Sequence, residues 1–417
     1  MFQISPCHRL LTLFIFLFYA MSGAAQNTVG CTDPQALNYD EMAVENDGSC
    51  NYPLTVYSPE LIGPLPDQVP ESSGLVLYDG CLWTHNDSGW SPNLFCLDPE
   101  NGDLIRETWV ANAQNRDWEE ITRDDDFLYI GDFGNNNGNR TDLVIYKVPL
   151  DKLSEDTAMA AAIFFDYPDQ TEFDSRPLDN DFDMEAMISF GDSLYLFSKN
   201  WTDLQTRLYA LPKTPGTFTA RLVDSFNVNG LITGAAIRSA DGLVVLVGYT
   251  PILSPFVWLL WDYRGTDFFS GHKRRIELGI PFHQVEAVCW NPGADHFYIS
   301  NERFNNIVTI PARLHRMEVN QWVDDHPTYA PHTPVEKRKL HIFPNPGIET
   351  LYIELPPDPF IETEILVIHS SGLQFSQKLV SPSQKKAKID VSQWPTGHYV
   401  ISLKADDGMY TAKFIKL

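Results

Sequence analysis

The feature that most constrains the fold is a motif that recurs through the middle of the chain. Its clearest copies begin at Asp117 (DWEEITRDDDFLYIGDFGNN), Asp183 (DMEAMISFGDSLYLFSKN) and Gln284 (QVEAVCWNPGADHFYISNE), and weaker copies begin at Glu71 and Ile232. Each copy places a short apolar run before a polar turn and a second apolar run after it, which is typical of a β-hairpin. A hairpin that recurs about every 50 residues predicts the blades of a β-propeller.

Two further strand-like runs follow each hairpin, such as residues 206–212 and 217–228 after the third copy. Four strands per copy predict an all-β propeller over residues 54–316 with five blades, or six if one divergent copy is unrecognised. The early run 54–65 has no blade of its own. We expect it to complete the last blade and close the ring, because closure removes exposed strand edges.

The inner strand of each blade should line a central channel, with alternate side chains facing the same way. Two neighbouring rings of side chains are then expected. The first contains Ser73, Glu119, Glu185, Gly234 and Glu286, and the second contains Glu71, Asp117, Asp183, Ile232 and Gln284.

Carboxylates crowded into one channel raise each other's pKa or require a counter-cation. A hard divalent ion with oxygen ligands, most naturally calcium, would satisfy them. The candidate metal ligands are Glu71, Asp117, Glu119, Asp183, Glu185 and Glu286. The alternative is a water-filled channel whose acids are solvated or bonded to backbone amides.

Further polar residues follow the second strands of the hairpins, near the same expected mouth. These candidate ligand-binding residues are His85, Asn86, Asp87, Asp132, Asn135, Asn301 and Glu302. The run GDFGNNNGNR, residues 131–140, is rich in residues that accept left-handed backbone conformations. It is either a binding loop or an ordinary inter-strand turn.

No catalytic residue can be assigned from the sequence. The chain has no GxSxG elbow, HExxH motif or phosphate-binding glycine loop, and nothing pairs His85 or His283 with a nucleophile. The formal charge of -25 argues against nucleic acid or an anionic membrane as partner. Two functions remain: a module that binds an extracellular ligand or protein at the acidic channel, or a metal-dependent hydrolase of phosphoesterase or lactonase type.

The N-terminus predicts export. Residues 1–25 combine basic residues, an apolar run too short to span a bilayer and a small-residue end, which is the pattern of a signal peptide. No later stretch is long and apolar enough to cross a membrane. Export permits disulfides, and we expect Cys31–Cys50 and Cys81–Cys96, with Cys289 as a buried free thiol.

The segment 26–53 contains GCTDPQALNYDEMAVENDGSC, which resembles a short module of secreted Bacteroidota proteins. It is interpreted as a disulfide-closed spacer, with a calcium loop as the alternative. In the propeller, ESSGL, LWTHNDSG and LYIGDFGNN resemble a family of secreted bacterial propellers without an assigned activity. More loosely, the inner-strand acid followed by LYIG is similar to calcium-activated nucleotidases, which implies five blades around a central calcium. No basic nucleotide-binding set accompanies that motif.

The last part of the chain predicts a second domain. After a Pro- and His-bearing linker, residues 317–338, the alternation in 351–355, 364–369 and 399–403 indicates a small Ig-like β-sandwich over 339–417. The runs FPNP (343–346), IDVS (389–392), GHYV (397–400) and KFIK (413–416) resemble the type A C-terminal sorting domain of type IX secretion substrates. This resemblance implies recognition by the type IX machinery, a secreted or surface-attached product, and removal of the domain after export.

Overall fold

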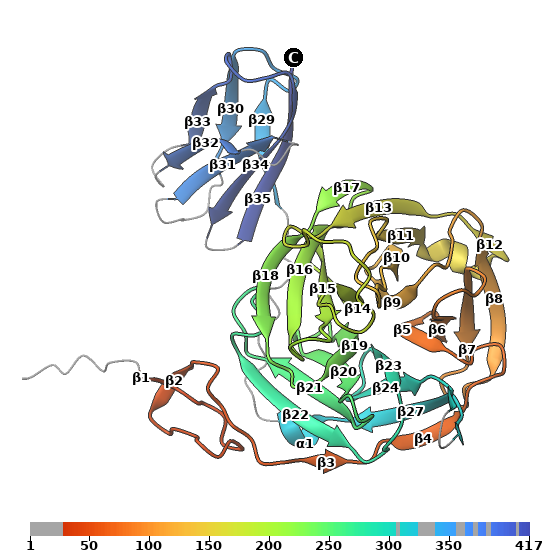
Figure 1. Cartoon of the computed structure of the whole chain (residues 1–417). Helices are drawn as coiled ribbons and strands as arrows, with labels where there is room; N and C mark the ends of the chain where they lie inside the picture. Colours follow the sequence, from red (N-terminus) through yellow and green to blue (C-terminus); the bar gives the residue numbers. More distant parts are fainter. Residues whose placement is uncertain are drawn as a thin grey trace, which may run out of the picture.

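The computed structural model describes residues 28–305, 309–323, 338–355, 363–369, 374–380, 385–405 and 408–417. The expected signal peptide and most of the expected linker therefore lie outside the described residues. Residues 28–305 and 309–323 contain five sheets arranged in a ring (Figure 1). The prediction of an all-β propeller with five blades is confirmed.

Each blade begins with its inner strand and continues outward by antiparallel pairing. Blade one contains β5 (Ser72–Tyr78), β6 (Cys81–Asn86), β7 (Asn93–Leu97) and β8 (Leu104–Val110); blade two contains β9 (Trp118–Arg123), β10 (Phe127–Asp132), β11 (Val144–Pro149) and β13 (Ala161–Asp166); blade three contains β14 (Asp183–Phe190), β15 (Ser193–Lys199), β16 (Thr206–Pro212) and β18 (Arg221–Phe226). Blade four contains β19 (Leu231–Ile237), β20 (Val244–Tyr249), β21 (Pro255–Trp261) and β22 (His272–Leu278); blade five contains β23 (Val285–Trp290), β24 (His296–Asn301), β27 (Arg313–Glu318) and β4 (Glu60–Pro64).

The ring is closed by a strand from the beginning of the chain. β4 pairs antiparallel with β27, so that Leu61 lies opposite His315 and Gly63 opposite Leu314. The early run was predicted to play this part, and it does. Three short strands extend other blades: β3 (Val56–Tyr57) pairs with β22, β12 (Thr157–Ala158) with β8, and β17 (Gly216–Thr219) with β13.

A β-bulge interrupts every inner strand, and in four of the five it skips a single residue. In blade two, Trp118 pairs with Asp132 and Glu120 with Gly131, which leaves Glu119 without a pairing partner. The corresponding residues are Glu185, Thr233 and Glu286, and in β5 the shift falls at Gly74 and Leu75. Because a bulge breaks strict alternation, the expected first ring was wrong at one position: Thr233 takes the place given to Gly234.

The core lies between the blades rather than at the axis. Five apolar clusters are found, each shared by two neighbouring sheets. For example, Trp83 of blade one and Trp118 of blade two are both fully buried in one cluster. Face-to-face packing of this kind fixes the inner strands and hence the side chains at the channel.

The propeller extends further than the sequence predicted. β27 continues to Glu318, and the short helix α1 (Asn320–Val323) follows it. Met317, Val319 and Trp322 are buried in the cluster between blades four and five. The expected boundary at residue 316 was therefore too early, because these three apolar side chains belong to the last blade.

The disulfide-closed N-terminal segment is docked on blade four rather than acting as a free spacer. It contains β1 (Thr28–Gly30), β2 (Ala43–Asn46) and the Cys31–Cys50 disulfide. Its anchors are on β22: Lys273 Nζ donates to Gly48 O at 3.2 Å, and Arg274 Nη1 donates to Gln35 Oε1 at 2.6 Å. The segment is closed by its disulfide as expected, and its contacts with β22 were not predicted, because nothing in the segment's sequence indicated these partners.

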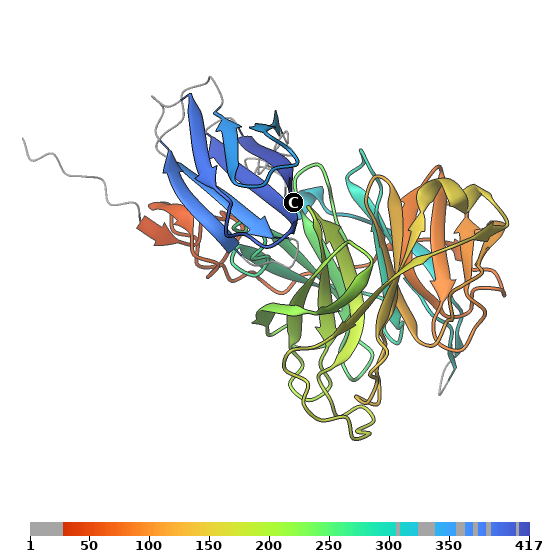
Figure 2. The ribbon, with the colours of Figure 1, turned by 90° about the horizontal axis from the view of Figure 1, so that it is seen from above.

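The other cysteine predictions are confirmed: Cys81 and Cys96 form a disulfide within blade one, and Cys289 is a buried free thiol. The C-terminal domain, in blue in Figure 2, has two sheets, ordered β28-β35-β34-β31-β32 and β29-β30-β33. Its strands are β28 (Arg338–Lys339), β29 (His341–Phe343), β30 (Thr350–Glu354), β31 (Thr363–His369), β32 (Gln374–Val380), β33 (Lys386–Asp390), β34 (Gly397–Ala405) and β35 (Gly408–Lys416). One apolar core joins the sheets, so the domain is a β-sandwich; its Ig-like topology stays a prediction.

Candidate functional site

Carboxylates from four blades gather where the inner strands begin. We call this end of the channel the acidic mouth; its residues are Glu71, Asp87, Asp117, Glu119, Asp183, Glu185, Glu286 and Glu302. Burial, reinforced by the neighbouring Glu71 and Asp183 carboxylates, raises the pKa of Asp87 to about 6. The side chains of blades one, two and three therefore share one electrostatic environment, as the recurring motif predicted.

Three of these carboxylates form a compact cluster. Oxygen atoms of Asp87, Asp117 and Glu119 all lie within 4.8 Å of one another. Burial and the carboxylates of Asp87 and Asp183 raise the pKa of Asp117 to about 7, and burial raises that of Glu119 well above its usual range. Among the residues that the structure describes, none of the three forms an ion pair. The cluster can hold a hard cation by its oxygen atoms.

The backbone of Gly134 is pressed against this cluster. A Cβ atom at Gly134 would lie 2.7 Å from Asp117 Cγ and closer still to Glu119 Oε1. Gly134 N also donates to Asp117 O at 3.2 Å. The second glycine of the GDFGNN run is therefore required by space at the cluster, a role that neither interpretation of the run, as a binding loop or as an inter-strand turn, included.

A buried lysine occupies the other side of the acidic mouth. Lys199 Nζ donates to Glu185 Oε1 at 3.1 Å and lies 5.2 Å from the ring centroid of Trp201. Burial alone would lower the pKa of Lys199, but Glu185, Tyr249 and Glu286 together raise it well above its usual value. Lys199 is thus a built-in counter-ion for this side of the mouth. The sequence analysis did not identify it, although it lies near the end of the motif copy that begins at Asp183.

Glu286 is only partly satisfied. Its Oε1 accepts a hydrogen bond from Tyr249 Oη at 3.2 Å, whereas Oε2 has no hydrogen-bond partner in the described part of the chain. The residue is 8% exposed. Burial raises its pKa to about 7, opposed by Lys199. An unpartnered carboxylate oxygen at the mouth leaves an acceptor available to a bound ligand.

Two of the predicted metal ligands have protein partners instead. Asp183 accepts hydrogen bonds from Asn135 N at 2.6 Å and Trp201 Nε1 at 2.8 Å, and Glu71 accepts one from Trp90 Nε1 at 2.5 Å. Of the six predicted ligands, only Asp117 and Glu119 lie in the three-carboxylate cluster. Asp87, predicted as a ligand contact, joins them there.

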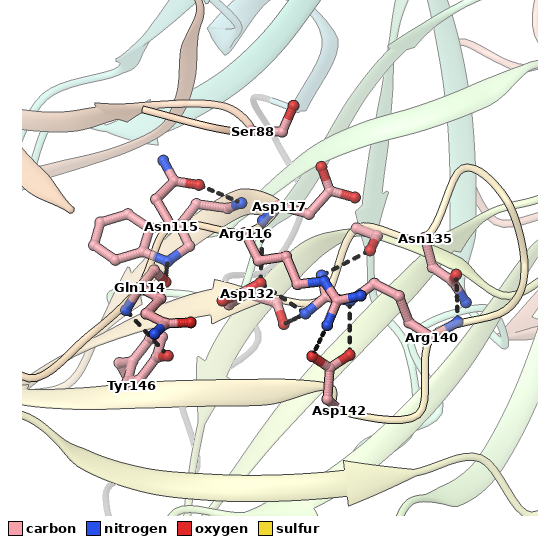
Figure 3. A network of polar contacts seen from close by, with 12 residues as sticks. Ser88, Gln114, Asn115, Arg116, Asp117, Asp132, Asn135, Arg140, Asp142 and Tyr146 are labelled. Carbon is pink, nitrogen blue, oxygen red and sulfur yellow. Dashed lines mark hydrogen bonds and ion pairs between the residues drawn. The ribbon is translucent and has the colours of Figure 1, made fainter. Parts of the chain in front are cut away.

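The loop of residues 131–140 is held from within by Arg140 (Figure 3). Arg140 donates from Nη2 to Asp132 Oδ1 at 2.8 Å and from Nη1 to Gly134 O at 2.9 Å, while Asn135 Oδ1 accepts from Arg140 N at 3.0 Å. Asp132 Oδ1 also accepts from Asp117 N at 3.1 Å. Asp132 and Asn135 therefore position the cluster through the backbone of the loop. Their side chains are engaged in these hydrogen bonds rather than directed to a ligand.

The remaining predicted ligand-binding residues differ in their surroundings. His85 is fully buried against Trp118, and burial lowers its pKa to about 4. Asn86 Nδ2 donates to Gln68 O at 2.8 Å and Asn301 Nδ2 donates to Pro311 O at 3.0 Å, so both NH₂ groups bind backbone, whereas Asn301 Oδ1 has no hydrogen-bond partner among the described residues. Only Glu302 faces the mouth: burial, Glu286 and Asp87 raise its pKa to about 9.

Glu120, which the sequence analysis passed over, closes the channel below the cluster. Its side chain is fully buried, with Oε2 accepting from Ala235 N at 2.8 Å and Oε1 from Ile121 N at 3.0 Å. Backbone N–H groups of Leu75 and Met187 stabilise its ionised form as well, although burial raises the pKa well above its usual range. One carboxylate thus binds the inner strands of four blades. The bulge at Glu119 is what lets two consecutive acids serve the axis.

The opposite end of the channel opens into a separate cavity of about 1420 Å³. Ile121, Ala235, Cys289 and Trp290 line it from the propeller, and Thr32 and Asn46 line it from the docked N-terminal segment. Ile121 and Ala235 also donate their backbone N–H groups to Glu120. The buried Glu120 side chain therefore lies between this cavity and the acidic mouth, and the two ends of the channel are distinct environments.

The C-terminal domain belongs to a known family. Residues 341–417 match the family described as secretion system C-terminal sorting domain. The chain carries a type IX sorting domain. This protein is therefore secreted or attached to the cell surface, as predicted. No helix among the described residues has the length and hydrophobicity needed to cross a membrane.

No curated protein matches the chain. Among solved structures, an exo-β-1,3-galactanase from Phanerochaete chrysosporium has a TM-score of 0.41 and 9% identity, covering 86% of this chain and 98% of that one. A quinonprotein alcohol dehydrogenase-like protein from Bacteroides thetaiotaomicron has a TM-score of 0.30 and 8% identity, covering 78% and 68%. The structure of U3-55K has a TM-score of 0.34 and 9% identity, covering 63% and 100%. These similarities are too low to indicate an activity or partner.

Proposed function

We propose that this exported propeller binds a divalent cation, calcium, through Asp87, Asp117 and Glu119, and offers the loaded acidic mouth to an extracellular ligand. The observation that carries the proposal is the gathering of three carboxylates with oxygen atoms within 4.8 Å of one another, none of which forms an ion pair with a described residue. At such separations like charges either take up protons or attract a cation. Lys199 is paired with Glu185 on the other side of the mouth, and its attraction offsets only part of the burial and like-charge effects that raise the pKa values of Asp87 and Glu119.

The donor set favours calcium over softer metals. All three groups are carboxylates, which suit calcium, magnesium and manganese, whereas zinc and copper select imidazole or thiolate. Calcium takes about six to eight oxygen ligands in flexible geometry. Three carboxylates fill part of that number, so water or ligand oxygens would supply the rest.

The proposal is tested by calorimetric titration of the full chain with calcium, followed by thermal melting with calcium and with EDTA. A site filled at a hundredfold excess over Kd stabilises the fold by about 2.7 kcal/mol, and Asp117→Asn should remove both the heat and the shift. Asp125→Asn is the matched control, because Asp125 is exposed in the hairpin turn at the other end of the same blade. Unchanged melting of the parent chain in calcium would remove the cation from the proposal.

A second candidate is a metal-dependent hydrolase of phosphoesterase or lactonase type at the same mouth. It is favoured by Glu286 and Glu302, whose pKa values of about 7 and about 9 would allow one to accept and the other to donate a proton near neutrality. The cation would supply Lewis acidity. Turnover of an aryl phosphate or a lactone that Glu286→Gln abolishes would favour the enzyme, and inactivity on both with intact calcium binding would favour the binding module.

A further inference from the structure

Two tryptophans border the acidic mouth, each fixed by its indole N–H to a carboxylate. Trp90 Nε1 donates to Glu71 Oε2 at 2.5 Å, and Trp201 Nε1 donates to Asp183 Oδ2 at 2.8 Å. Trp90 lies three residues after the candidate cation ligand Asp87. It is 42% exposed, although a fixed indole ring is ordinarily among the more buried side chains. An oriented, exposed ring beside a candidate site presents an apolar face to a ligand.

The two rings have different surroundings. The ring centroid of Trp201 lies 5.2 Å from Lys199 Nζ, and Tyr249 packs on the same ammonium at 5.8 Å. The aromatic pocket that would receive a cationic amine is therefore already filled by the protein's own lysine. No lysine or arginine among the described residues packs on the ring of Trp90. Of the two tryptophans, Trp90 therefore has the ring face that is open to a ligand.

The charges at the mouth restrict what that ligand can be. Three carboxylates with one divalent cation still carry net negative charge, and Glu71 adds to it at the Trp90 side. An anionic phosphate, sulfate or carboxylate ligand would be repelled. An ammonium ligand would compete with the cation and with Lys199. A neutral ligand with several hydroxyl groups meets neither obstacle and can use the unpartnered Oε2 of Glu286 as an acceptor.

We propose that the ligand is a neutral saccharide, whose ring packs on Trp90 while neighbouring hydroxyl groups complete the coordination of the cation at Asp87, Asp117 and Glu119. The inference rests on the proposed function for its cation. Vicinal hydroxyls supply hard oxygen donors in place of water, and the C–H face of a pyranose is apolar enough to cover an indole. Polar groups placed around an aromatic wall are the usual composition of a small-molecule site.

The test is a glycan array probed with the full chain in calcium and in EDTA, with neutral, sialylated and sulfated glycans on the same slide. Neutral glycans should bind in calcium and be lost in EDTA, and the anionic ones should not bind. The best neutral glycan is then titrated by calorimetry against variants. Trp90→Ala should weaken binding at least about tenfold, as expected for an aromatic anchor, and Trp90→Phe should restore most of it.

Trp109→Ala is the matched control. Trp109 is a 49% exposed tryptophan of the same blade, but it lies on the outer strand β8, so its loss should leave affinity unchanged. Because both tryptophans are exposed, loss of folding is not expected in either variant, and melting curves check this.

The outcomes separate this inference from the one beneath it. No glycan binding, while calorimetry still detects calcium, overturns the saccharide and leaves the cation site standing. Glycan binding that depends on Trp90 but survives EDTA, in a chain that binds no calcium, overturns the cation and retains the saccharide. Equal affinity for Trp90→Ala and the parent chain, or a preference for anionic glycans, overturns the proposal.

Discussion

Lys199 Nζ and Glu185 Oε1 lie 3.1 Å apart, with side-chain exposures of 7% and 2%. The pair divides the acidic mouth into two halves. On one half Lys199 lies against Glu185 and attracts Glu286; on the other, Asp87, Asp117 and Glu119 form no ion pair with any described residue and feel cations only at longer range. A single mouth can then present a fixed positive charge and a place for an exchangeable one.

Removal of the lysine should strongly destabilise the propeller. Lys199→Met leaves Glu185 buried without its partner, which costs about 3–5 kcal/mol in comparable cases. The free energy of unfolding from urea denaturation measures the effect. Lys152→Met should leave it essentially unchanged, because Lys152 is exposed in its pair with Glu155. A loss as small for Lys199→Met as for the control would contradict the assignment of Lys199 as an essential counter-ion.

The glycine beside the cluster allows a steric test of the cation site. Gly134→Ala places a methyl group against Glu119 and Asp117, so the three carboxylates should no longer converge and calcium affinity should fall at least about tenfold. Isothermal titration with calcium measures this. Asn139→Ala, an exposed change in the same loop, should leave the affinity unaltered. Calcium binding that tolerates both changes equally would place the ion elsewhere.

The axial carboxylate should matter for stability in proportion to its hydrogen bonds. Glu120→Gln keeps the size of the side chain but removes the charge and turns an NH₂ group toward backbone N–H donors. A loss of about 1–3 kcal/mol is expected from such unsatisfied groups. Urea denaturation provides the value, with Glu155→Gln on the exposed surface as control. If Glu120→Gln unfolds like the parent chain, Glu120 does not hold the inner strands together.

Acid should weaken blade five through two adjoining histidines. His283 and His315 are buried with ring centroids 5.8 Å apart, and His283 Nε2 and His315 Nδ1 have no partner among the described residues. Burial, then His283 and Arg313, lowers the pKa of His315 from 6.5 to about 4, and burial chiefly lowers that of His283. The folded state therefore takes up protons less readily than the unfolded one.

The sign of the pH effect follows from those shifts. The contribution of His315 to stability is complete above about pH 6.5 and is lost as the pH falls toward 4, by at most about 1.4 kcal/mol per pH unit. The His315→Phe chain should lose less stability over this interval than the parent chain in urea denaturation at stepwise pH. His341→Gln, an exposed change in the C-terminal domain, is the control. Parallel pH profiles for parent and His315→Phe chains would contradict this account.

The architecture was readable from the sequence because every blade repeats one hairpin. The recurring acids and apolar runs sufficed to predict five blades, the closing strand and the meeting of Asp117 with Glu119. The exact ring membership was not readable, since the bulge in β19 moves the ring position from Gly234 to Thr233. Ion pairs between residues that are not neighbours in sequence could not be predicted either, because no local sequence pattern indicates them. Arg140 engages Asp132, and Lys199 meets Glu185 only after the chain has folded.

The position of β4 sets an order on assembly. Blade five requires residues 60–64 from one end of the propeller and 313–318 from the other, so no partial product can finish the ring. A chain stopped after blade four would keep the early strand β4 unpaired and exposed to aggregation and proteolysis, because its partner β27 would not yet exist. The propeller can therefore close only after β27 has been synthesised. At that stage, translation has nearly reached the sorting domain, residues 341–417.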